Sequence, residues 1–207
     1  MRRACLAAAL VAVLHSPASA APCDSTDACL RVLAAAQATT RSVDARFVQT
    51  KHVSLLDAPL VSTGRFRFRR PDRVRLDVET PRPMTILIAG RSVTIPGLTE
   101  TEQQAVADSP MATMFTELGA LFAGSLDRAP AHFAIEARGT DDGVAVTLTP
   151  RAPEFQRLFR TIVLRFGGPE AVVRSMRLDE ALGDHLEVEL RDVRRNVELP
   201  DALFTTP

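Results

Sequence analysis

The stretch that decides the fold is GRFRFRRPDRVRLDVETPRP, residues 64–83. Apolar and charged residues alternate along both arms, which is the period of a β-strand, and the Pro-Asp pair between the arms indicates a turn. A two-residue turn would place apolar residues opposite arginines. The alternation therefore favours a three-residue loop, residues 71–73, which keeps one face apolar and pairs Phe68 with Leu76.

Arg70 is the residue of this hairpin whose environment has two interpretations. If the alternation continues to the end of the first arm, Arg70 lies on the apolar face with Phe66 and Phe68. A cation in that place needs hydrogen-bond partners, because an unpaired buried charge is costly. The alternative is that the strand ends at Arg69 and that Arg70 is in solvent. The residues themselves leave both interpretations open.

The first residues have the pattern of an export signal. Two arginines precede an apolar run, residues 4–14, which is too short to cross a membrane, and small residues typical of a cleavage site follow it. We expect a signal peptide at 1–20 and a single domain at 21–207. Because Pro22 precedes Cys23, where a lipidation signal needs a small residue, we expect export without a lipid anchor.

Cys23 and Cys29 remain after cleavage at this site. In an oxidising compartment an even pair predicts a structural disulfide. The spacing differs from the C-x-x-C of thiol oxidoreductases, and no third ligand nearby suggests zinc.

Composition and motifs exclude several classes of function. The chain has 25 Lys and Arg against 25 Asp and Glu, with no basic patch that would indicate nucleic-acid binding. No G-x-S-x-G, phosphate-loop or H-E-x-x-H motif is present, so we expect no catalysis, no metal and no cofactor. Trp and Tyr are absent, whereas Phe occurs 10 times. Such apolar residues suit an aliphatic ligand, or they simply form the core.

The remaining patterns predict a meandering sheet and two helices. Strands are expected at 43–54, 60–70, 74–79, 85–89, 92–95, 133–138, 144–149, 161–166, 172–179 and 185–193. Short turns between them indicate an antiparallel sheet with one apolar face. One helix should run from about residue 26 to 40, with Leu30, Val32 and Leu33 on its apolar side, and a second, with a clear apolar stripe, over 110–123. These helices are the long amphipathic elements available to cover the curled sheet.

In order and spacing, several motifs of this chain resemble those of the LolA family of periplasmic outer-membrane lipoprotein carriers. The motifs are FVQTK at 47–51, GRFRFRRP at 64–71, ILI at 86–88, LTP at 148–150 and FTTP at 204–207. The resemblance implies an α+β fold: a strongly curved, incompletely closed antiparallel β half-barrel with helices covering its apolar concave face. It also implies that Arg70 lies inside and bonds to the backbone of the covering helices.

The same resemblance implies a function without catalysis. Family members bind the acyl chains of a lipoprotein and move them through the periplasm, from an inner-membrane transporter to an outer-membrane acceptor. We expect transient contacts with both and a monomeric carrier. The expected ligand-binding residues are Phe66, Phe68, Arg70, Val74, Leu76, Val78, Ile86, Ile88, Met111, Met114, Phe115, Leu118, Leu121 and Phe122.

The identity of the cargo is left open by one departure from the family pattern. Members usually carry Trp and Tyr in the early hairpins, and this chain has neither. A related protein that carries another lipid therefore fits as well as a lipoprotein carrier. Two further alternatives are a periplasmic lipid-sensing or regulatory module and an accessory to an envelope lipid-conjugate biosynthetic system.

Overall fold

A computed structural model describes residues 23–90, 92–109, 112–114, 132–168 and 170–205. The expected signal peptide lies outside these residues. So does most of the expected second helix at 110–123, of which residues 112–114 are described and are helical.

The sequence folds into one ten-stranded antiparallel sheet, in the order β5-β4-β3-β2-β1-β10-β9-β8-β7-β6. The order is linear, with β5 and β6 as edge strands, so the sheet is open. Its strands are β1 (Ser42–His52), β2 (Leu60–Arg69), β3 (Arg73–Thr80), β4 (Met84–Ala89), β5 (Ser92–Thr94), β6 (Phe133–Thr140), β7 (Gly143–Pro150), β8 (Phe159–Gly167), β9 (Val172–Glu180) and β10 (His185–Arg195). Every expected strand is present, and the predicted α+β antiparallel class is confirmed.

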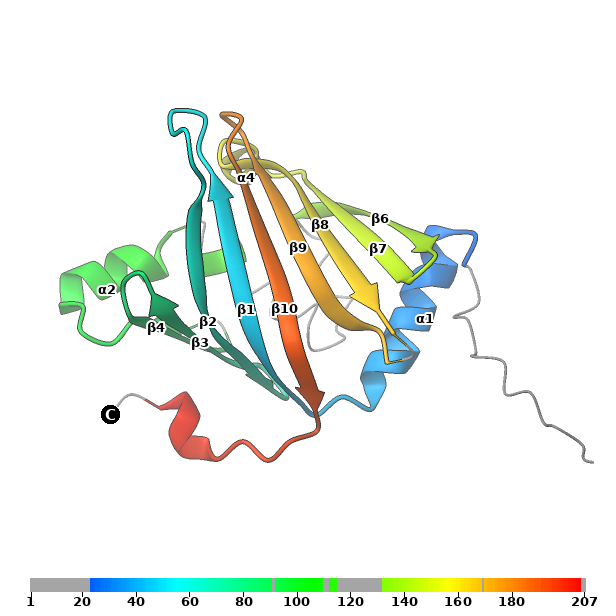
Figure 1. The fold of residues 1–207 in the computed structure, drawn as a ribbon, viewed down its shortest axis with the longest axis horizontal. Coiled ribbons are helices and arrows are strands. Elements are labelled where there is room, and N and C mark those ends of the chain that lie inside the picture. Colours follow the sequence, from blue (N-terminus) through cyan, green and yellow to red (C-terminus); the bar gives the residue numbers. More distant parts are fainter. Residues whose placement is uncertain (1–22, 91, 110–111, 115–131, 169, 206–207) are drawn as a thin grey trace, which may run out of the picture.

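Besides the helical residues 112–114, the described part of the chain contains α1 (Thr26–Ala38), α2 (Glu100–Ala107), α4 (Pro153–Gln156) and the 3-10 helix η2 (Asp201–Phe204). Figure 1 shows a bent and twisted sheet, with α1 beside β6 and β7 and α2 on the side of β4. The predicted first helix is confirmed, and Ser25 caps it by accepting a hydrogen bond from the Ala28 N–H. Its buried residues are Cys29, Leu33 and Gln37, whereas Val32, expected on the apolar side, is exposed.

The register of the hairpin differs from the predicted one by two residues. Phe68 pairs with Val74 and Phe66 with Leu76, so the loop comprises residues 70–72. A shift of two keeps each side chain on its expected face. Next to this loop, the Arg70 N–H donates to the carbonyl of Arg41 and so extends the pairing of β2 with β1 beyond Arg69. β2 itself ends at Arg69.

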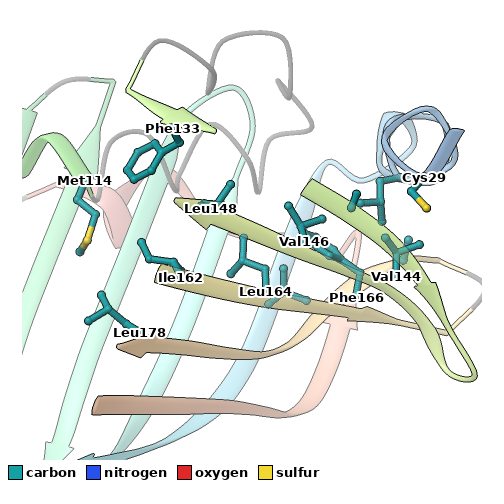
Figure 2. Packing of buried hydrophobic residues seen from close by; sticks show 14 of the residues in the cluster. Cys29, Met114, Phe133, Val144, Val146, Leu148, Ile162, Leu164, Phe166 and Leu178 are labelled. Atoms are coloured by element: carbon teal, nitrogen blue, oxygen red, sulfur yellow. The ribbon is translucent and has the colours of Figure 1, made fainter. Parts of the chain in front are cut away.

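Strand register brings apolar residues from each of the ten strands to the same face of the sheet. They form two clusters of buried side chains. The β6–β9 cluster includes Phe133, Ile162 and Leu164, which Figure 2 shows, and also Phe155, Phe159 and Leu33 of α1. The β1–β5 cluster comprises Phe47, Phe66, Phe68, Val74, Ile86, Ile88, Val93 and Ala112. Leu190 of β10 packs against both clusters, so the apolar face is continuous across the centre of the sheet.

The opposite face is polar around a buried carboxylate. Asp44 is 3% exposed and forms ion pairs with Arg65, Arg67 and Arg194. The hydrogen bond from Arg65 lowers the pKa of Asp44 and outweighs the opposite effect of burial. The carboxylate is therefore charged at neutral pH, and its cations satisfy it.

The C-terminal segment covers part of this polar face. Arg69 donates to the carbonyl of Leu199 at 2.6 Å, and Arg75 donates to that of Leu203 at 2.9 Å. The guanidinium of Arg69 also lies over the ring of Phe204, 4.9 Å from its centre.

Candidate functional site

The expected ligand-binding residues of the two early hairpins lie together. Phe66, Phe68, Val74, Ile86 and Ile88 are buried members of the β1–β5 cluster, and Leu76 and Val78 pack against it half-buried. Met114 is buried in the β6–β9 cluster. Five further expected residues lie outside the described part of the chain: Met111, Phe115, Leu118, Leu121 and Phe122.

Several residues of this face were absent from the expected set. Phe47 of β1 is 3% exposed and pairs with Gly64 of β2. An ideal Cβ on Gly64 would lie 2.0 Å from the Asp77 carbonyl oxygen and 2.7 Å from the Phe47 ring, so only glycine fits. The alternation of β1 could have revealed Phe47. Val93 and Leu190 required knowledge of which strands are neighbours.

Arg70 binds the C-terminal end of α1. Its Nε donates to the carbonyl of Thr40 at 2.5 Å, and its Nη2 donates to that of Gln37 at 2.8 Å. The strand ends at Arg69, as the second interpretation expected, but the half-buried side chain of Arg70 binds the helix end instead of lying in solvent. The carbonyls at the end of a helix carry partial negative charge, which a guanidinium stabilises.

A second arginine, Arg195 at the end of β10, binds the same helix end. Its Nη2 donates to the carbonyl of Ala36 and to the hydroxyls of Thr39 and Thr40, and its Nη1 pairs with Glu170 at 3.0 Å. The sequence held no local signal for this contact, because it depends on β10 lying beside β1. Two arginines that are far apart in the sequence, one just after β2 and one at the end of β10, thus hold the end of α1 on the sheet.

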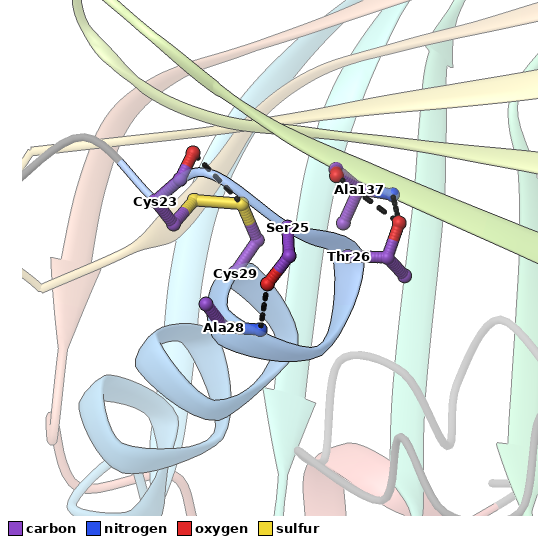
Figure 3. Close-up of a disulfide and its surroundings, with 6 residues drawn as sticks. All are labelled: Cys23, Ser25, Thr26, Ala28, Cys29 and Ala137. Atoms are coloured by element: carbon purple, nitrogen blue, oxygen red, sulfur yellow. Dashed lines mark hydrogen bonds between the residues drawn. A yellow bond between two sulfur atoms is a disulfide. The ribbon is translucent and has the colours of Figure 1, made fainter.

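The other end of α1 is attached to β6. The sulfur atoms of Cys23 and Cys29 are bonded, with their Cα atoms 5.1 Å apart, and the Ala137 N–H donates to the Thr26 hydroxyl at 3.2 Å (Figure 3). The helix is therefore fixed at its N-terminal end by the edge of the sheet and at its C-terminal end by arginines.

A small cavity lies where the end of α1 meets the sheet. It has a volume of about 20 Å³, and its walls include Gln37, Val43, Phe66, Val173 and Leu190. Phe66 belongs to the β1–β5 cluster and Val173 to the β6–β9 cluster, so the cavity marks the junction of the two.

The described ranges contain no group of three His, Cys, Asp or Glu residues that could bind a metal ion. No helix in the same ranges has the length and apolar character needed to cross a membrane.

Comparisons with known proteins agree with this geometry. Residues 38–207 match the family described as "Outer membrane lipoprotein carrier protein LolA". An outer-membrane lipoprotein carrier protein of Chromohalobacter salexigens is 26% identical over 143 residues, which are 69% of this chain and 65% of that protein. One of Dechloromonas aromatica is 27% identical over 172 residues, or 80% of this chain and 76% of that protein.

Among solved structures, MucB has a similar fold, with a TM-score of 0.50 at 14% identity over 88% of this chain and 62% of that one. At this identity the likeness concerns the fold alone. The match to the family covers most of the sequence, including the hairpin and both arginines. The chain therefore belongs to the LolA family, a family of outer-membrane lipoprotein carriers and not of enzymes.

Proposed function

We propose that this protein binds the acyl chains of a lipoprotein, or of another lipid, on the apolar face of its sheet and moves them from the inner towards the outer membrane. The observation that carries this proposal is the continuous apolar face across all ten strands, whose two clusters meet beneath the end of α1. Aliphatic and phenyl side chains suit a hydrocarbon ligand, whose burial gains roughly 0.8 kcal/mol for each methylene.

In this proposal the bent sheet acts as an incompletely closed half-barrel, with its apolar face concave and α1 and the segment 110–123 as covers. Phe66, Leu76 and Ile88 would line the part of the acyl site that the β1–β5 cluster forms. Two supports are the attachment of α1 at both its ends and the burial of Ala112 and Met114 in the two clusters. The chain would bind where the covers separate from the sheet.

Arg70 would oppose binding, because an acyl chain that lifts the end of α1 must break its hydrogen bonds to Gln37 and Thr40. Closure and cargo then compete, and the competition limits affinity enough to allow release to an acceptor. Arg195 would add to the same effect.

The cellular setting is part of the proposal. The pattern of the first twenty residues supports export to the periplasm of a monomeric domain at 21–207. The family supports transient contacts with an inner-membrane transporter and an outer-membrane acceptor. Without Trp or Tyr, the face offers fewer polar handles than an aromatic-rich site and takes hydrocarbon chains of several lipid classes.

Two half-buried aliphatic residues on opposite faces provide a matched test. Leu76 packs on the apolar face, whereas Val48 of β1 lies on the polar face. Leu76→Glu should abolish binding of a fluorescent fatty acid, because it places a charge where the chain lies. Val48→Glu should bind as the unaltered protein does. Equal binding by the two variants would contradict the assignment of the face.

Native mass spectrometry of protein purified from its own host tests the cargo. Bound lipid or acylated peptide is the expected result. A stable protein partner without lipid would instead indicate a regulatory binding module.

A further inference from the structure

Gln37 presents a buried acceptor without a partner. The residue is 5% exposed, and its Oε1 has no hydrogen-bond partner among the residues that the structure describes. Its backbone carbonyl, in contrast, accepts from Arg70 and from the Thr40 N–H. An unpaired buried acceptor destabilises a folded protein, and a leucine of similar size would avoid this cost.

Gln37 lines the cavity at the junction of the two clusters. The volume of about 20 Å³ is enough for one water-sized group and too small for a chain. A buried water needs two to four polar partners. Apart from Gln37, the polar side chain in the wall is that of Thr40, whose hydroxyl accepts two hydrogen bonds from Arg195 and keeps its O–H as a donor. The side chains of the wall thus offer a water no more than the minimum of two partners, whereas a ligand with a single donor group needs only the free acceptor of Gln37.

We propose that Gln37 Oε1 is the polar anchor of the acyl site and accepts a hydrogen bond from an N–H or O–H group attached to the acyl chain. The ligand class is an acyl chain with such a donor near its carbonyl end: an N-acylated amine or a hydroxylated acyl group. This inference rests on the proposed function, since it names the part of the same site that distinguishes one acyl ligand from another.

The position of Gln37 connects the anchor to closure. The same residue accepts a hydrogen bond from Arg70 at its backbone carbonyl and lines the cavity. A ligand that bonds to Oε1 therefore occupies the junction between α1 and the sheet. The apolar walls, Phe66 and Leu190, then guide the hydrocarbon along the face in either direction.

A matched pair of ligands isolates the hydrogen bond. N-methyldodecanamide and methyl dodecanoate have nearly the same shape, but only the amide has an N–H. A third ligand, the methyl ester of a β-hydroxy dodecanoic acid, carries an O–H donor in place of the N–H. Affinities are measured by displacement of a fluorescent fatty acid from the unaltered protein, from Gln37→Leu and from Gln49→Leu. Gln49 is a half-buried glutamine of β1 that shares the apolar face with Phe47 but lies outside the cavity wall, so it controls for loss of an amide from that face.

The unaltered protein and Gln49→Leu should prefer a donor-bearing ligand over methyl dodecanoate by about three- to tenfold, the range expected for one net hydrogen bond. Gln37→Leu should bind methyl dodecanoate unchanged and lose the preference. Selectivity for the amide alone would assign an N-acyl ligand, and selectivity for the alcohol alone would assign a hydroxyacyl ligand.

Three results separate the possible failures. Equal affinity for all three ligands in the unaltered protein would overturn the anchor while leaving the carrier function intact. A preference that persists in Gln37→Leu would overturn it as well. Failure of every ligand to displace the fatty acid, or failure of the fatty acid to bind, would contradict the proposed function itself. In addition, Gln37→Leu should melt at the same or a higher temperature, and a lower one would show that Oε1 is satisfied in the free protein.

Discussion

Replacement of Arg70 by leucine tests whether α1 is held on the sheet by its C-terminal end. The change removes two hydrogen bonds from a guanidinium to the carbonyls of Gln37 and Thr40. Bonds of this charged kind contribute about 1.5–3 kcal/mol each. Because the side chain is half-buried, the low end applies, and the pair together gives about 3 kcal/mol. Arg195 keeps its own bonds, so α1 should loosen without leaving the fold.

Amide hydrogen exchange measures this loosening directly. A loss of about 3 kcal/mol in local opening corresponds to roughly a hundredfold faster exchange in the last turns of α1. Amides of β7 and β8, far from the contact, should change little. Arg46→Leu is the control: Arg46 is 78% exposed, its pair with Asp192 is 3.9 Å long, and such surface pairs contribute little. Arg69 is unsuitable as a control, because it binds the C-terminal segment.

If the amides of α1 exchange at the same rate in Arg70→Leu and Arg46→Leu, the helix end is held by packing alone. Arg70 would then have no part in closure, and the competition between closure and cargo would be refuted.

Further predictions concern stability. Gly64→Ala should lower the free energy of unfolding by about 3 kcal/mol, as overpacking against Asp77 and Phe47 does, and urea unfolding that matches the unaltered protein would contradict the close approach. The pKa of Asp44 is lowered in the folded state, so its stabilisation is complete above an unfolded pKa of about 3.9 and is lost as the pH falls through the lower folded value. Asp44→Asn should flatten the acid limb of stability measured against pH, and an unchanged limb would exclude this carboxylate. Replacing Cys23 and Cys29 by serine should cost about 2 kcal/mol, since the loop is short, and alkylation without reductant should find neither thiol free in the unaltered protein.

The strands were predictable because their signal is local. Alternation with period two decides which face of the sheet a residue occupies. Every strand predicted from it is present in the observed sheet. The register of the hairpin was not predictable in this way, since a shift of two residues leaves every side chain on its expected face. Val32 was misplaced because the face of α1 that is buried depends on how the helix lies against β6.

The helices illustrate the same difference between local and long-range signals. The start of α2 carries a capping box, in which Thr99 accepts from the Glu102 N–H and Glu102 accepts from the Thr99 N–H. The pattern is local, but it was not used, and α2 was absent from the expected helices. Arg195, in contrast, reaches α1 only because the last strand pairs with the first, and no spacing along the chain indicates this.

Photo-crosslinking of a bound acyl chain tests the central claim most directly. A fatty acid with a diazirine at its terminal carbon is bound, irradiated and located by peptide mass spectrometry. The account predicts saturable labelling of apolar-face residues such as Phe66, Leu76 and Ile88, reduced by competing unlabelled fatty acid. Labelling confined to the polar face around Val48, or labelling that competitor does not reduce, would contradict it.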